Sequence, residues 1–110
     1  MITKPSQAQP KPPPGVSKEA STLWYALVAE YAISDPAGLA VLGQAVEAHG
    51  RIRSAQKAIK RDGVTIQDRW GQTKPHPCLS AERDARSSFL AALRALNLDL
   101  EPLRDRPTRR

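Results

Sequence analysis

The sequence has few of the residues on which several common classes of protein depend. Cys78 is the only cysteine among 110 residues, so neither an intrachain disulfide nor a thiolate cage for zinc can form. No apolar run approaches the ~20 residues that span a bilayer, and the N-terminus lacks the apolar stretch of a secretory signal. We therefore expect an intracellular protein without a membrane segment.

Sequence motifs of common enzyme classes are also missing. There is no GxxxxGKS phosphate loop, no HExxH pair and no CxxC pair. The eleven acidic residues form no cluster suited to two-metal nuclease chemistry, and Glu82 and Asp84 are interpreted as carboxylates near the N-terminus of the third helix, where they complement its dipole. We expect no catalytic residue, no metal site and no cofactor.

The length allows one small domain. Five of the ten prolines lie in residues 1–16, where apolar side chains are too few to offset the entropy of ordering, so this segment is predicted to be a disordered tail. Residues 17–103 then form the domain, and residues 104–110 form a basic tail. A core built from roughly ninety residues is marginal for a monomer, which favours self-association.

Apolar periodicity predicts an all-α fold with three main helices. The spacing from Ala20 to Tyr31 indicates a first helix with Ser17 as its N-cap. A second helix is expected from about Pro36 to Arg61, closed by Gly63 in a left-handed cap. A third begins between Pro77 and Ser80 and runs to about Leu96, with Asn97 as its C-terminal cap.

A small β-hairpin or ordered loop is expected between the second and third helices. Residues 64–66 favour a strand, Trp70 and Gly71 are typical of a turn, and residues 72–74 can return beside the first strand. Residues 98–103 are predicted to pack as an extended strip.

The second helix is predicted to change character along one face. At about 100° per residue, Arg53, Lys57 and Lys60 occupy the same angular sector as Leu39, Leu42 and Val46 earlier in the helix. The face that packs in the first half should therefore become a basic face in the second half.

The net charge of +6 is distributed in blocks. Residues 19–50 carry four acids and no base, whereas residues 51–74 carry seven bases and two acids. A solvated helix end also gathers cations, but residues 51–61 hold no acid for i, i+4 pairs. Phosphate binding is therefore predicted for this block, whose seven basic residues are Arg51, Arg53, Lys57, Lys60, Arg61, Arg69 and Lys74.

The aromatic and histidine residues are interpreted from their positions. Trp24 falls on the buried face of the first helix, and His49 falls on the apolar stripe of the second, which favours a histidine at a helix interface. His76 is predicted to be a loop residue. Trp70 has no obvious cover at the hairpin tip, so it either folds back on the core, packs on a neighbouring subunit or stacks on nucleic acid.

The order of these elements resembles the small subunit of bacteriophage terminase over about residues 15–104. The resemblance is carried by four stretches in order, which are GVSKEASTLWYALVAEY, ISDPAGLAVLGQAVEAHGRIRSAQKAIKRDGVTI, GQTKPHP and AERDARSSFLAALRALNLDLEPLRDR. It implies a non-enzymatic packaging protein of the host cytoplasm that assembles as a homo-oligomeric ring. It also implies binding to double-stranded phage DNA and regulation of the ATPase and nuclease of the large terminase subunit.

Three other functions stay open at the level of sequence. A small helical transcription regulator would need base-reading side chains at the start of a recognition helix, where the third helix offers only Arg83 and Arg86. A structural adaptor of the phage head would use the basic block to hold another protein. A phage nuclease is the most remote hypothesis.

Overall fold

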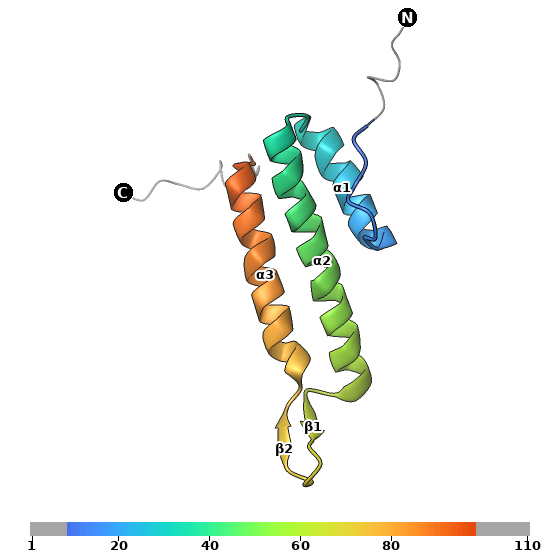
Figure 1. Cartoon of the computed structure of the whole chain (residues 1–110), viewed down its shortest axis with the longest axis vertical. Helices are drawn as coiled ribbons and strands as arrows, with labels where there is room; N and C mark the ends of the chain where they lie inside the picture. The colour runs from blue at the N-terminus through green and yellow to red at the C-terminus, as the bar shows by residue number, and fades with distance from the viewer. Residues whose placement is uncertain (1–8, 99–110) are drawn as a thin grey trace, which may run out of the picture.

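The computed structural model describes residues 9–98, which fold into three helices and one hairpin (Figure 1). In chain order the elements are α1 (Lys18–Tyr31), α2 (Pro36–Asp62), β1 (Thr65–Gln67), β2 (Thr73–Pro75) and α3 (Pro77–Leu96). The predicted all-α fold with a small hairpin between the second and third helices is confirmed.

Capping residues set the ends of the helices. The Ser17 hydroxyl accepts a hydrogen bond from the Ala20 amide at 3.1 Å, and the Asp35 carboxylate accepts one from the Gly38 amide at 2.8 Å. Gly63 closes α2 with φ of 88°, and Asn97 closes α3 in the left-handed conformation with φ of 56°. The predicted cap positions at Ser17, Gly63 and Asn97 are thus confirmed, but Gly63, with ψ of 167°, does not adopt the left-handed helical conformation predicted for it.

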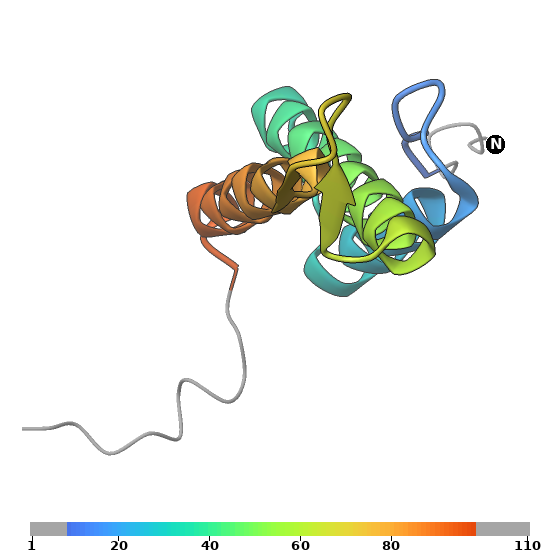
Figure 2. The same cartoon turned by 90° about the horizontal axis from the view of Figure 1, so that it is seen from below.

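Helix α2 lies between the other two helices, and α3 runs antiparallel along it (Figures 1 and 2). Leu42 and Val46 of α2 are completely buried, and Trp24 of α1 is 3% exposed beside them. The ring of His49 packs against Phe89 of α3, with 5.7 Å between the ring centroids. The predictions for Trp24 and His49, as core and helix-interface residues, are therefore confirmed.

Because α1 has 14 residues and α2 has 27, α1 covers only the first half of α2 (Figure 1). The face of α2 that buries Leu42 and Val46 beneath α1 presents exposed Lys57 and Lys60 further along. The change from an apolar to a basic face, which the angular positions predict, thus coincides with the end of the α1 layer.

Residues 9–16 pack against the helices, although the sequence predicts them to be part of a disordered tail. The Trp24 indole Nε1 donates a hydrogen bond to the Pro10 carbonyl at 2.7 Å. A Cβ atom placed on Gly43 would lie 3.2 Å from Pro13 Cγ, so this glycine lets the proline-rich segment approach α2 closely. The remainder of the predicted tail, residues 1–8, lies outside the described residues, as do residues 99–103 of the predicted strip and the basic tail 104–110.

The hairpin joins α2 to α3 and projects from the end of this helix pair that lies away from α1 (Figure 1). Its strands are antiparallel, with Thr65 opposite Pro75 and Gln67 opposite Thr73. Asp68 Oδ1 shapes the turn by accepting hydrogen bonds from the Trp70 and Gln72 amides at 2.9 and 3.0 Å.

Candidate nucleic-acid interface

The seven basic residues of the predicted interface are all exposed, and they lie on the second half of α2 and on the hairpin. Lys57 and Lys60 are one turn apart on the face that α1 leaves uncovered, with Arg53 and Arg61 in the neighbouring turns. Arg51 points about 120° or more away from the two lysines, at about 100° per residue. We call Arg53, Lys57, Lys60 and Arg61 the basic face.

Arg53 takes part in a polar chain that crosses all three helices. Its Nε lies 3.3 Å from Oε1 of Glu19 in α1, and its Nη1 donates to Gln56 Oε1 at 2.8 Å. Gln56 Nε2 in turn donates to Glu82 Oε2 of α3 at 3.2 Å, and Glu82 also pairs with Arg86. Arg53 therefore has a structural role, and Glu19 offsets part of its charge.

Arg61 is also engaged within the chain, at the junction of α2 and α3. Its Nε and Nη2 donate to the two oxygens of Asp62 at 2.7 and 2.8 Å, which raises the pKa of Arg61. These hydrogen bonds, together with one from His76, hold the pKa of the Asp62 carboxyl well below its usual range.

His76 connects the end of α2 to the start of α3. Its Nδ1 accepts a hydrogen bond from the Cys78 amide at 2.9 Å, so the ring proton resides on Nε2, which donates to Asp62 Oδ2 at 2.9 Å. The side chain is only 6% exposed, and its residue is the N-cap of α3. The sequence-based interpretation of His76 as a loop residue missed this role.

The Asp62 contacts predict a loss of stability in acid. Because the folded-state pKa is lowered, Asp62 stabilises the fold above its unfolded pKa of about 4, and this contribution disappears as the pH falls through the folded pKa. Chemical denaturation at a series of pH values should show a weaker acid dependence in Asp62→Asn than in the wild type. Asp84→Asn, which removes an exposed carboxylate 3.8 Å from Arg83, is the charge-matched control. If the unfolding free energies of Asp62→Asn and the wild type fell equally at low pH, the stabilising role of Asp62 would be contradicted.

At the hairpin tip the Arg69 guanidinium lies over the Trp70 ring, 5.2 Å from its centroid. Trp70 is 76% exposed, so it does not fold back on the core. Packing on a neighbouring subunit and stacking on nucleic acid remain as the two alternatives. Lys74 is exposed on β2.

The unpaired cations of the interface are thus a subset of the predicted seven. Within residues 9–98 no carboxylate lies within 4.0 Å of the charged groups of five of them, which are Arg51, Lys57, Lys60, Arg69 and Lys74. Lys57 and Lys60 are the two that share one helix face. The ammonium groups of this pair make no ion pair with any described residue.

Residues 20–102 match the family model described as phage terminase, small subunit. The chain belongs to this family. Membership gives the protein a role in the packaging of phage DNA, and it confirms the resemblance that the sequence indicates. No curated protein and no solved structure matches the chain.

The length and hydropathy of the described helices of this terminase small subunit were compared with those of membrane-spanning helices. Not one of them combines the length and the apolar character that crossing a bilayer requires. The longest helix, α2, instead carries the basic face.

Proposed function

We propose that this small subunit binds double-stranded phage DNA through its basic face and passes it to the large terminase subunit, whose ATPase and nuclease it regulates. The observation that carries the proposal is the pair Lys57 and Lys60, which is exposed and unpaired on the stretch of α2 that α1 does not cover. In a family that packages DNA, such a pair is suited to hold phosphates.

The contacts that we propose are with the DNA backbone rather than with base edges. The two unpaired members of the basic face are the lysines Lys57 and Lys60, whose ammonium groups are suited to neutralise phosphates. Arg53 and Arg61 are held by Glu19 and Asp62, and they flank the lysines with partly offset charge. The subunit acts by binding and has no catalytic site of its own.

Self-association makes such weak contacts sufficient. One or two phosphate contacts from each subunit give little affinity, but a ring of identical subunits presents them together and raises the effective concentration of each. We therefore include a homo-oligomeric ring in the proposed function. Such a ring binds DNA stably and in a salt-sensitive way.

The salt dependence of DNA binding tests the proposal. We expect the affinity of the wild type for duplex DNA, measured by fluorescence anisotropy, to fall steeply between low and moderate salt. Replacing Arg53, Lys57, Lys60 and Arg61 by Gln should flatten the plot of log K against log salt by up to about 0.9 for each phosphate that the variant no longer neutralises. An unchanged slope would place the DNA contacts elsewhere, on the chain termini.

Matched double variants separate charge from structure, because Arg53 and Arg61 also make intramolecular contacts. Lys57→Gln with Lys60→Gln removes two unpaired charges from the basic face, and Arg83→Gln with Arg94→Gln removes two charges from α3. We expect the double lysine variant to flatten the plot of log K against log salt. The double arginine variant should keep the slope of the wild type. Equal effects would mean that only net charge matters.

A further inference from the structure

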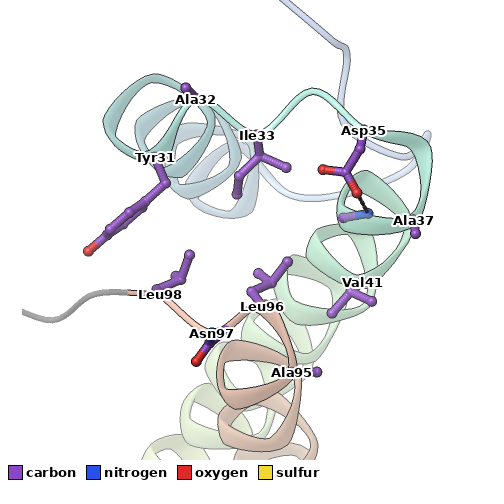
Figure 3. Close-up of a pocket in the computed structure, with 11 residues that line it drawn as sticks. Tyr31, Ala32, Ile33, Asp35, Ala37, Val41, Ala95, Leu96, Asn97 and Leu98 are labelled. Atoms are coloured by element: carbon purple, nitrogen blue, oxygen red, sulfur yellow. Dashed lines mark hydrogen bonds between the residues drawn. The ribbon is translucent and has the colours of Figure 1, made fainter.

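An open cavity lies at the end of the molecule where α1 ends, α2 begins and α3 ends (Figure 3). Its volume is about 530 Å³, within the range of sites that enclose a drug-sized group. Apolar side chains from all three helices and the segments that flank them converge on it, notably Ile33, Val41, Leu96 and Leu98. The cavity therefore offers an apolar binding site with no cover from the described residues.

The electrostatics of the cavity favour a cation. Its lining includes the carboxylate of Asp35 and no Lys or Arg. The left-handed cap residues Ala32 and Asn97 also line it, so the C-terminal ends of α1 and α3 bring partial negative charge to its wall. The N-terminal end of α2 lies there too, and its partial positive charge is offset by the Asp35 cap. Asp35 Oδ2 is occupied by the Gly38 amide, whereas Oδ1 accepts no hydrogen bond from a described residue.

The hairpin tip has the complementary properties. Trp70 is a large aromatic side chain that is 76% exposed, and the Arg69 guanidinium stacked on it adds a positive charge. Trp and Arg are the side chains most often found as anchors that fill a pocket in a partner protein. The turn is held by Asp68 hydrogen bonds, so the tip is preorganised for docking.

The hairpin lies at the C-terminal end of α2 (Figure 1), whereas the cavity is lined by residues at the N-terminal end of α2. Helix α2 is about 40 Å long at 1.5 Å per residue. A chain therefore cannot place its own Trp70 in its own cavity. Residues 99–110 are the alternative occupant, but they hold no aromatic residue, and the acids Asp99 and Glu101 precede their first arginine, so the charges nearest the cavity match its negative character. A second copy supplies the aromatic group and the cation together.

We infer that the Arg69–Trp70 tip of one subunit docks into the cavity of the next, with the indole against Ile33 and Leu96 and the guanidinium facing Asp35. The contact is head-to-tail, so each copy keeps one free tip and one free cavity, and repetition builds a closed ring or an open chain of subunits. The inference specifies an interface for the self-association in the proposed function. It does not depend on where DNA binds.

Two single substitutions and their mixture test this interface. Trp70→Ala removes the anchor, and Ala95→Arg places a cation at the rim of the cavity, in the last turn of α3, where a positive charge suits the helix end. We expect native mass spectrometry and sedimentation to show assemblies for the wild type and about 30-fold weaker association for either variant, as for an interface anchor. Tyr25→Ala, an exposed aromatic of α1 outside both surfaces, should assemble like the wild type.

The mixture gives the decisive result. Trp70→Ala retains an intact cavity and Ala95→Arg retains an intact tip, so a 1:1 mixture should form a heterodimer of twice the 12.0 kDa chain mass and grow no further. Three results would overturn the inference: assembly of Trp70→Ala at wild-type strength, a mixture that stays monomeric, or loss of DNA affinity by Trp70→Ala with unchanged assembly. Reduced stability of Ala95→Arg with unchanged assembly would also overturn it, because the chain's own C-terminal residues would then fill the cavity.

These outcomes are distinct from failure of the proposed DNA binding. Lys57→Gln with Lys60→Gln should assemble like the wild type, since neither lysine belongs to the tip or the cavity. Loss of assembly in that variant would overturn the separation of the two surfaces.

Discussion

Replacing Trp24 by Ala should lower the free energy of unfolding by about 3–5 kcal/mol, the range for truncating a large core aromatic residue. Trp24 is 3% exposed and lies against the α2 residues that form the centre of the core. It also donates to the Pro10 carbonyl, so its loss frees the segment of residues 9–16 that packs over α1 and α2. Since the total stability of a small domain is about 5–15 kcal/mol, this substitution removes a large share of it.

Urea denaturation followed by circular dichroism measures this effect, at a chain concentration low enough for the wild type and all variants to be monomeric, because association adds to apparent stability. Trp70→Ala is the control of the same residue type, and its exposed ring predicts a change within about 0.5 kcal/mol. Trp24→Phe keeps an aromatic ring and removes the Nε1 donor, so it should fall between the wild type and Trp24→Ala. Equal stability of Trp24→Ala and Trp70→Ala would contradict the described core.

His76→Ala should cost about 2–3 kcal/mol of unfolding free energy. The substitution removes the acceptor for the Cys78 amide at the start of α3, for which about 1 kcal/mol is typical. It also removes the hydrogen bond to the charged Asp62, which adds a comparable or larger amount. Because His76 joins α2 to α3, we expect the hairpin amides to exchange with solvent faster as well.

His76→Asn is the matched variant for this prediction. Asn is a favoured N-cap and can accept from the Cys78 amide, but its shorter side chain does not reproduce the bond to Asp62. Thermal and urea denaturation should therefore place its stability between those of His76→Ala and the wild type. A His76→Ala variant as stable as the wild type would show that the junction is held by other contacts.

The helices follow from local chemistry that the sequence displays. Ser17, Gly63 and Asn97 act at helix ends through their own side chains or backbone preferences, so residue type and position suffice to predict them. The switch from Leu42 and Val46 to Lys57 and Lys60 on one face of α2 is equally local, because helical geometry alone aligns those positions.

The interactions that the sequence did not reveal join residues far apart in the chain. His is not a preferred N-cap, and the role of His76 depends on Asp62 lying beside it. The packing of residues 9–16 depends on the Trp24 indole and on the space above Gly43. Composition marks that segment as proline-rich but does not show the groove that receives it.

The structure narrows the set of predicted DNA-binding residues to those whose charge is unpaired. All seven predicted residues are exposed. However, Arg53 pairs with Glu19 and Arg61 pairs with Asp62, so part of the positive charge counted from the sequence is offset within the chain. The first of these pairs spans 34 positions and exists because the N-terminal end of α1 lies beside the second half of α2. Lys57 and Lys60 remain as the unpaired centre of the basic face.

The most direct test of the account is a lysine footprint on the assembled protein. Chemical acetylation with and without saturating duplex DNA, read by mass spectrometry, reports the accessibility of each ammonium group. We predict that DNA protects Lys57 and Lys60 while the N-terminal Lys4 and Lys11 react as in the free protein. Protection confined to Lys4 and Lys11, with Lys57 and Lys60 fully reactive, would contradict the assignment of DNA binding to the basic face.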